Sequence, residues 1–288
     1  MSNPTPVTAG FEISNSSGDI IRGDVRYRED GRNHPAVIVC HSFMAFKDWG
    51  FFPHVGEELA RAGFFSVVFN FSHNGVTGKN PRITDFDRFA ENTFSKELED
   101  LRAVVDAVDD GTLGAHVAKQ ESIGLMGHSR GAGIAILHAS SDVRIGALVS
   151  WSAVATFDRW TPHQKKMWRE RGFLPMSSDP AVSKWQVGVG LLDDIEQRGE
   201  SLNIPSAASR IQIPWLILHG AEDLTVRPRE GELLYSASGR STTEFVLLEH
   251  AGHLFHGSSP EEDGYKTLNN ALGITSAWFS RHLSKEHA

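Results

Sequence analysis

The sequence feature that most constrains this chain is the run Gly127-His128-Ser129-Arg130-Gly131, which matches the pattern G-x-S-x-G. An apolar, strand-like run (residues 123–126) precedes it, and small residues that favour a helix follow from 132 to 139. A serine at a sharp turn between strand and helix has strained backbone angles, and side chains at the flanking glycines would collide with neighbouring elements. The N-terminus of the helix would face the negative charge that develops when Ser129 attacks a carbonyl. The pattern therefore favours a nucleophilic serine over a plain glycine-rich turn.

Composition limits the classes of function that the chain can have. Its 288 residues, 40% of them hydrophobic, are enough for one large or two small domains. The formal net charge of −8 argues against a nucleic-acid partner, because a binding face would need clustered positive charge. The single cysteine, Cys40, lies in an apolar run, so we expect it to pack in the core without an internal disulfide.

The amino terminus lacks the basic segment and following apolar segment of a secretory signal. No window of the sequence approaches the run of about 20 apolar residues that a membrane span requires. We therefore expect a cytoplasmic protein that does not insert stably into a membrane.

Apolar runs and amphipathic runs alternate along most of the chain, which is typical of an α/β protein. The expected strands are residues 11–14, 20–27, 36–40, 64–71, 123–126, 145–149, 214–219 and 243–248. The expected helices are residues 52–62, 94–108, 132–139, 229–236 and 265–283. Residues 72–92 are polar and contain glycine and proline, so we expect a long loop there. The prediction is a mostly parallel central sheet with helices on both faces.

Residues 155–210 interrupt this alternation, and we interpret them as an insertion over one end of the sheet. The predicted core is then residues 1–154 and 211–288, with 155–210 as a cap or lid. Within the insertion, Thr161 is a predicted N-cap, Pro162 the first helical residue and Gly172 the residue just past the helix. The basic side chains of this helix fit a solvated face best, with an anion site and a membrane-surface patch as alternatives.

Two later loops carry groups that could activate Ser129. Asp223 follows the strand at 214–219, and His253 follows the strand at 243–248. Both loops would lie at the carboxyl edge of the sheet, on the same side as Ser129. Glu222 and His250 are alternatives for the two roles. Three histidines spaced by three, His250, His253 and His256, would share a face only on a helix, and the glycines here indicate a loop, so no metal site is predicted.

With Ser129, Asp223 and His253 in this order, each after a predicted strand, the sequence resembles the α/β-hydrolase family. The resemblance covers nearly the whole chain outside the insertion. The resemblance implies that Ser129 is the nucleophile, His253 the general base and acid, and Asp223 the group that orients the imidazole. It implies an oxyanion hole with backbone N–H donors from Arg130 and Phe43. In the loop that carries the second donor, the family usually has His-Gly followed by an apolar residue. This chain has His41-Ser42-Phe43, so Ser42 stands in place of the glycine. No cofactor is needed.

The tryptophans of the insertion suggest what kind of substrate it would select. If the insertion closes over Ser129, Trp160, Trp168 and Trp185 would supply an apolar or aromatic wall. The resemblance then extends to capped serine carboxylesterases, including the cinnamoyl or feruloyl type. We expect a small-molecule ester substrate. A thioester or peptide cleaved by the same residues, and a non-catalytic binding module, remain alternatives, and the oligomeric state is open.

Overall fold

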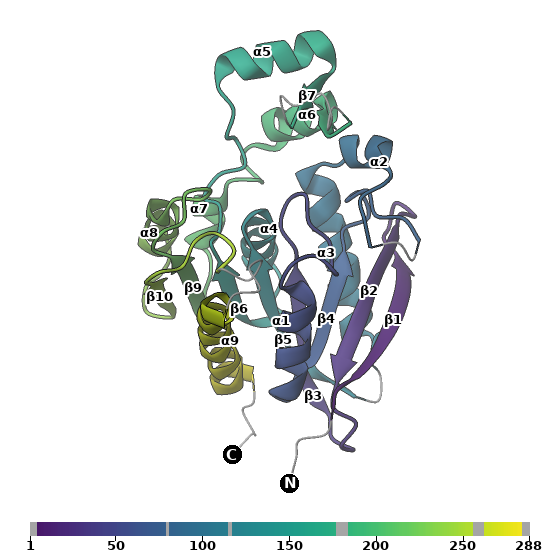
Figure 1. Cartoon of the computed structure of the whole chain (residues 1–288), viewed down its shortest axis with the longest axis vertical. Coiled ribbons are helices and arrows are strands. Elements are labelled where there is room, and N and C mark those ends of the chain that lie inside the picture. Colours follow the sequence, from purple (N-terminus) through teal and green to yellow (C-terminus); the bar gives the residue numbers. More distant parts are fainter. Residues whose placement is uncertain (1–4, 79–80, 115–116, 177–183, 256–261, 284–288) are drawn as a thin grey trace.

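The computed structural model describes residues 5–78, 81–114, 117–176, 184–255 and 262–283 (Figure 1). Within these residues the strands are β1 (Val7–Ser14), β2 (Ile20–Tyr27), β3 (His34–Cys40), β4 (Phe65–Asn70), β5 (Ala118–His128), β6 (Ile145–Trp151), β7 (Phe173–Pro175), β8 (Gln186–Gly188), β9 (Trp215–Gly220) and β10 (Thr243–Leu248). The helices are α1 (Phe52–Arg61), α2 (Phe86–Ala90), α3 (Phe94–Asp109), α4 (Arg130–Ala139), α5 (Pro162–Arg171), α6 (Val189–Arg198), α7 (Ile204–Ala208), α8 (Pro228–Ala237) and α9 (Glu262–Leu283).

In the described part of the chain, eight strands form one sheet in the order β1-β2-β4-β3-β5-β6-β9-β10. β2 pairs antiparallel with both β1 and β4. The remaining neighbours in this sheet, β4-β3-β5-β6-β9-β10, pair in parallel. The predicted mostly parallel α/β fold is therefore confirmed. The register of β3 and β5 places Cys40 opposite Gly127, so the loops that follow these two strands begin side by side at the carboxyl edge.

Each face of the sheet packs against its own set of helices, as Figure 1 shows. Along β3, Ile38 and Cys40 face a core shared with α3, α4 and α8, while Val37 and Val39 face a core shared with α1 and α9. A strand buried on both faces needs a continuous apolar run, and this explains the sequence of β3. Cys40 is fully buried, and burial raises the pKa of its thiol, so it belongs to the core.

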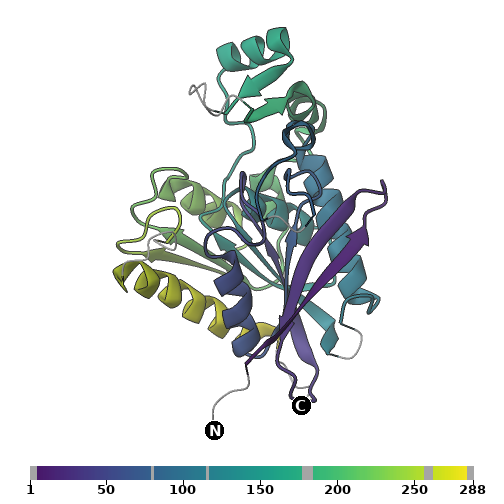
Figure 2. The same cartoon turned by 45° about the vertical axis from the view of Figure 1, so that its right-hand side comes forward.

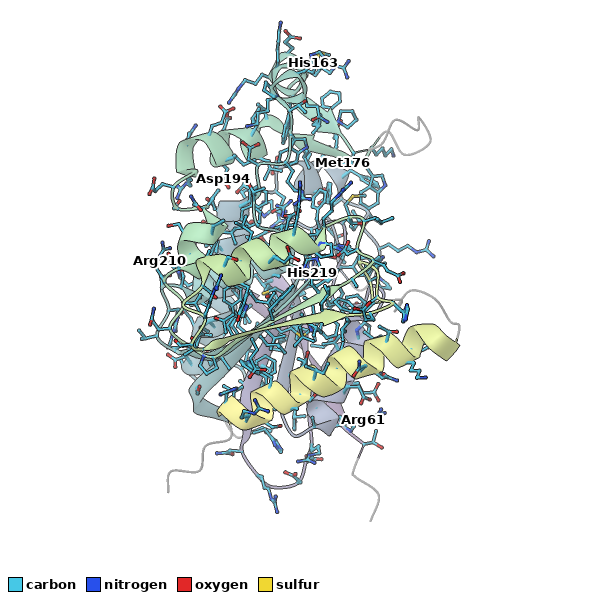
Figure 3. All side chains as sticks on the ribbon, turned by 90° about the vertical axis from the view of Figure 1, so that its left-hand side faces the viewer. Arg61, His163, Met176, Asp194, Arg210 and His219 are labelled. Carbon is cyan, nitrogen blue, oxygen red and sulfur yellow. The ribbon has the colours of Figure 1, made fainter. Side chains whose placement is uncertain are left out.

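The segment after β6 rises from the carboxyl edge of the sheet. α5, the short antiparallel pair β7–β8 and α6 stand above that edge (Figure 2), and His163 on α5 lies at the far end from the sheet (Figure 3). The predicted caps of α5 are present, because the Thr161 hydroxyl accepts from the Gln164 N–H and Gly172 has a left-handed φ of 79°. α7, also within the predicted insertion, instead packs against α4 and α8 in the body.

Two short elements differ from the sequence-based expectation. The predicted loop at 72–92 contains α2, which begins where the Asp85 carboxylate accepts from the Arg88 N–H. The insertion contains the β7–β8 pair, although no strand is evident from its sequence. Among the helices of the described residues, none is long and apolar enough to cross a membrane.

Candidate active site

Ser129 lies at the sharp turn between β5 and α4, with φ 55° and ψ −120°. A non-glycine residue in this region is strained and persists only where the surrounding structure enforces it. The flanking glycines permit the turn, because a Cβ on Gly127 would lie 2.5 Å from the Gly131 carbonyl oxygen. A Cβ on Gly131 would lie 2.3 Å from the His41 carbonyl oxygen, in the loop after β3. The turn thus brings Ser129 against that loop.

The structure brings Ser129, His253 and Asp223 together. His253 Nε2 lies 3.1 Å from Ser129 Oγ, and His253 Nδ1 lies 2.7 Å from Asp223 Oδ2. The three residues come from the loops after β5, β10 and β9, which end at the same edge of the sheet. The Ser129 side chain therefore has a base within hydrogen-bond distance, and that base has a carboxylate behind it.

Asp223 is held as a carboxylate by its surroundings. Its side chain is fully buried, and burial alone would raise its pKa, but the hydrogen bond and charge of His253 hold the pKa below its ordinary value. Its other oxygen accepts from the N–H groups of Thr225 and Val226, both at 2.9 Å. A carboxylate can only accept, so His253 carries its proton on Nδ1 and turns the Nε2 lone pair toward Ser129.

The two alternative residues contact each other. Glu222 is exposed and lies 3.4 Å from the exposed His250. His256 lies outside the described residues. In the described part of the chain, no group of three or more histidine, cysteine or acidic side chains is placed to hold a metal ion.

His128 is a buried residue of this site that the sequence analysis did not single out. Its Nε2 lies 2.8 Å from the His253 carbonyl oxygen, and the two rings are 4.8 Å apart between centroids. Burial lowers the pKa of His128 to about 3, so the ring is neutral and Nε2–H donates to the carbonyl. His128 therefore anchors the loop that carries His253. The sequence signal that could have pointed to His128 is its position directly before Ser129 in the G-x-S-x-G run.

The two predicted oxyanion donors belong to α4 and to the loop after β3. Arg130 is the first residue of α4, and Phe43 belongs to the loop after β3. Neither backbone N–H donates a hydrogen bond to any residue that the structure describes. His41 holds the loop, because its Nδ1 lies 2.8 Å from the Ser42 carbonyl oxygen and its Nε2 accepts from the Phe71 N–H at 3.2 Å. Both N–H groups therefore stay predicted donors for an oxyanion.

Of the three tryptophans predicted to form an apolar wall, the structure places Trp168 inside the insertion. Trp168 is fully buried and donates from Nε1 to the Val187 carbonyl oxygen at 3.0 Å, and Trp160 packs edge-on against it at 5.0 Å. A tryptophan buried in this way stabilises the insertion itself and has no face left for a ligand. Trp185 is half-buried and packs against Phe89 of α2.

The basic side chains of α5 are mostly paired with carboxylates. Lys165 lies 2.5 Å from Asp158, and Arg169 contacts Asp193 at 2.9 Å and Glu196 at 2.5 Å. These pairs tie α5 to the stem of the insertion and to α6. Because the charges are largely neutralised, the helix fits the predicted solvated face better than a site for an anionic group.

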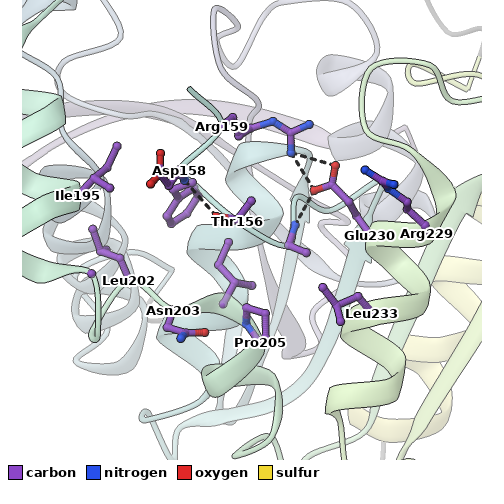
Figure 4. A pocket seen from close by; sticks show the side chains of 14 residues that line it. Thr156, Asp158, Arg159, Ile195, Leu202, Asn203, Pro205, Arg229, Glu230 and Leu233 are labelled. Atoms are coloured by element: carbon purple, nitrogen blue, oxygen red, sulfur yellow. Dashed lines mark hydrogen bonds and ion pairs between the residues drawn. The ribbon is translucent and has the colours of Figure 1, made fainter. Parts of the chain in front are cut away.

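A cavity of about 900 Å³ lies between residues 155–159, the end of α6, α7 and α8 (Figure 4). Ile204 and Leu233 give it apolar walls, and the Arg159–Glu230 ion pair, at 2.7 Å, closes one side. Glu230 also accepts from the Ala155 N–H at 2.9 Å, so the stem of the insertion is fixed to α8 beside this cavity.

A serine, a histidine and a carboxylate gathered at the carboxyl edge of a mostly parallel sheet define the arrangement of an α/β hydrolase. The model of the Alpha/beta hydrolase family matches residues 37–263, and the chain belongs to that family. An uncharacterized 31.7 kDa protein from the traX-finO intergenic region of Escherichia coli is 23% identical over 292 residues, covering 90% of this chain and 94% of that protein.

A further relative and two solved structures are also similar to this chain. The 2,6-dihydropseudooxynicotine hydrolase of Paenarthrobacter nicotinovorans is 24% identical over 207 residues, covering 69% of this chain and 47% of that enzyme. Among solved structures, the α/β hydrolase GrgF from Penicillium sp. sh18 matches 97% of this chain and all of its own with a TM-score of 0.74 at 16% identity. The esterase domain of a Rhodothermus marinus protein matches 96% of this chain and all of its own with a TM-score of 0.65 at 18% identity. At these identities the likeness to solved structures shows the fold.

Proposed function

We propose that this protein is a serine hydrolase that cleaves carboxylic esters through an acyl-enzyme intermediate. One observation carries the proposal: His253 Nε2 lies 3.1 Å from Ser129 Oγ while Asp223 supports its other nitrogen at 2.7 Å. A serine hydroxyl is a poor nucleophile until a base removes its proton, and this geometry supplies the base. Family membership and the esterase among the similar structures support the same assignment.

In the proposed mechanism, Ser129 Oγ attacks the ester carbonyl carbon while His253 Nε2 takes the hydroxyl proton. The carbonyl oxygen becomes an oxyanion that accepts from the N–H groups of Arg130 and Phe43. The C–O bond to the alcohol then breaks, and the imidazolium gives its proton to the leaving oxygen. Water repeats the sequence, and the acid and Ser129 are released. Asp223 stabilises the imidazolium in both halves. No cofactor enters these steps.

We also propose that residues 155–210 act as a cap that shapes the substrate pocket. The Val154 N–H donates to the Ser129 carbonyl oxygen at 3.4 Å, and the cavity described above begins at the next residue, Ala155. Its apolar walls would suit the hydrocarbon part of an ester. The carboxylesterase class, and its cinnamoyl or feruloyl type, belong to this proposal and are tested by substrate choice.

The test is a panel of substrates with Ser129→Ala as the matched control. Acyl esters of increasing chain length, aryl esters including methyl ferulate, thioesters and amides are compared at one enzyme concentration. The expected result is ester hydrolysis by the wild type and a loss of kcat on the order of 10⁶-fold in Ser129→Ala. A preference for thioesters or amides would show that the substrate belongs to one of those classes and is not an ester. Ester hydrolysis that is unchanged in Ser129→Ala would contradict the proposal.

A further inference from the structure

The side chain of Arg130 occupies an unusual position beside the nucleophile. Only 7% of the residue is exposed, and its guanidinium carbon lies 4.2 Å from the ring centroid of Phe94 and 4.8 Å from that of Phe43. Phe94 is the first residue of α3, and Phe43 belongs to the loop after β3. The guanidinium thus bridges a helix of the body and the loop that carries a proposed oxyanion donor.

A buried carboxylate fixes the guanidinium on the α3 side. Arg130 Nε donates to Glu97 Oε2 at 3.0 Å, and Asn92 Nδ2 donates to Glu97 Oε1 at 2.7 Å. The side chains of Arg130 and Glu97 are only 9% and 5% exposed. Because both members of the pair are held inside the body, the guanidinium is a rigid support for whatever rests on it.

The ring of Phe43 is held from a second direction as well. It stacks on Phe89 of α2 at 5.6 Å with 29° between the planes, and Phe89 packs edge-on against Trp185 of the insertion at 5.5 Å. Phe43 therefore rests between Arg130 and α2. Two contacts on one ring restrict its movement, and through the short side chain they also restrict the movement of the Phe43 backbone.

We propose that the side chain of Arg130 is a positioning residue that holds the Phe43 ring and thereby keeps the Phe43 N–H directed at the oxyanion. The inference rests on the proposed function, because it assigns the second donor its support. Arg130 then contributes twice: its backbone N–H contacts the oxyanion, and its guanidinium fixes the loop that bears the other donor. An error of about 1 Å in such a donor is enough to weaken transition-state stabilisation strongly.

A buried guanidinium suits this task better than other side chains. Burying a charge is costly, and the Glu97 partner offsets that cost only while the geometry is kept. Lysine would retain the charge, but it lacks the planar group that stacks on two rings and donates from Nε at the same time. An aliphatic side chain would fill the space without fixing the Phe43 ring by a directed contact.

The first test is the double variant Arg130→Met/Glu97→Gln, which removes both charges together so that no unpaired carboxylate stays buried. Steady-state kinetics with p-nitrophenyl acetate should show kcat lowered by at least about 10-fold with KM changed less than about 2-fold, because the lost interaction acts in the transition state. The pH profile of the rate should be unchanged, because His253 and Asp223 are not altered. The single variant Arg130→Lys, which keeps the positive charge, should also have a kcat below that of the wild type.

A second variant covers the case in which the double variant does not fold. Phe89→Leu leaves all charges in place and removes the ring that supports Phe43 from the other side. It should show the same pattern, a lower kcat with a steady KM, to a smaller extent. Arg144→Met is the matched control, since Arg144 pairs with Asp142 at 2.7 Å before β6, at the opposite end of the sheet from Ser129. It should lose stability and keep kcat.

The labelling rate of Ser129 by a fluorophosphonate separates this inference from the proposed function. Phosphonylation also places negative charge on an oxygen in the oxyanion hole, so the second-order rate should fall in the double variant and in Phe89→Leu whatever the natural substrate is. A wild type that is not labelled would refute the proposed function and this inference with it. A wild type that is labelled, with unchanged rates in folded variants, would overturn the inference alone. A rise in KM at constant kcat would also overturn it, since Arg130 would then bind substrate.

Discussion

At the scale of single residues, the site depends on which of two adjacent acidic residues, Glu222 or Asp223, contacts His253. Asp223 is fully buried and faces His253, whereas Glu222 is exposed and faces His250. The Thr225 and Val226 N–H groups donate to the Asp223 carboxylate and fix its short side chain. The exposed side chain of Glu222 is not fixed in this way. The loop after β9 therefore offers the imidazole a single well-placed carboxylate.

Replacing Asp223 by Asn should lower kcat by about 10⁴-fold, because an amide can donate to Nδ1 and so favour the wrong tautomer of His253. Glu222→Gln is the matched control and should retain activity close to that of the wild type. Steady-state kinetics on the same ester measure both. A loss in Glu222→Gln that equals the loss in Asp223→Asn would contradict the assignment of Asp223.

At the scale of elements, the site depends on how closely α4 approaches the end of β3. The space for a Cβ on Gly131 is occupied by backbone, with the His41 and Cys40 carbonyl oxygens at 2.3 and 2.7 Å. Backbone cannot rotate away as a flexible side chain can, so only glycine fits here. The same approach places the loop after β3 beside Ser129.

Gly131→Ala should therefore push α4 and the loop after β3 apart, lowering the unfolding free energy by about 1–3 kcal/mol and lowering kcat with it. Gly190→Ala is the control, because its Cβ would meet nothing within 4 Å on α6. Urea unfolding and ester kinetics measure the two effects. Equal stability and activity in both variants would show that the close approach is not needed.

The sequence predicted the elements whose patterns are long and regular. The parallel strands, α3 and the caps of α5 follow from apolar runs, helical spacing and local capping residues. α2 and the β7–β8 pair were missed because they are short, and α2 also packs against a distant segment through Phe89 and Trp185. Residue type alone cannot tell a tryptophan that lines a pocket from one that packs inward, so the burial of Trp168 could not be predicted.

The candidate site was predictable to a similar degree. Ser129, Asp223 and His253 each follow a strand, and parallel strands bring such loops to one edge. The support around them was not predictable, because the Arg130–Glu97 pair joins residues 33 positions apart through burial and geometry rather than through a local pattern.

At the scale of the whole molecule, buried neutral histidines couple the site to the stability of the fold. Burial lowers the pKa of His41 and His73 to about 4 and that of His128 to about 3, from an ordinary value of 6.5. The folded protein keeps these rings neutral, while the unfolded chain takes up protons as the pH falls below 6.5. Stability that is present above that pH is therefore lost progressively on acidification.

The unfolding free energy should fall as the pH is lowered from about 6.5 toward about 4, each of the three rings contributing up to about 1.4 kcal/mol per pH unit. Urea unfolding at a series of pH values measures this slope. His128→Gln keeps a donor for the His253 carbonyl but removes one titrating ring. Its slope should therefore be smaller by up to about 1.4 kcal/mol per pH unit, the contribution of one proton. Burial raises the pKa of Asp100 to about 7, so protonation of this carboxyl opposes part of the slope. A slope in His128→Gln equal to that of the wild type would therefore contradict the burial of His128 as a neutral ring.

The central claim is that Ser129 is a nucleophile because His253 removes its proton. Peptide mapping by mass spectrometry after treatment with a fluorophosphonate tests this most directly. The predicted result is one adduct, on the peptide that contains Ser129, which is absent from Ser129→Ala and strongly reduced in His253→Ala. A folded wild type without an adduct, an adduct on another residue, or full labelling of His253→Ala would contradict the claim.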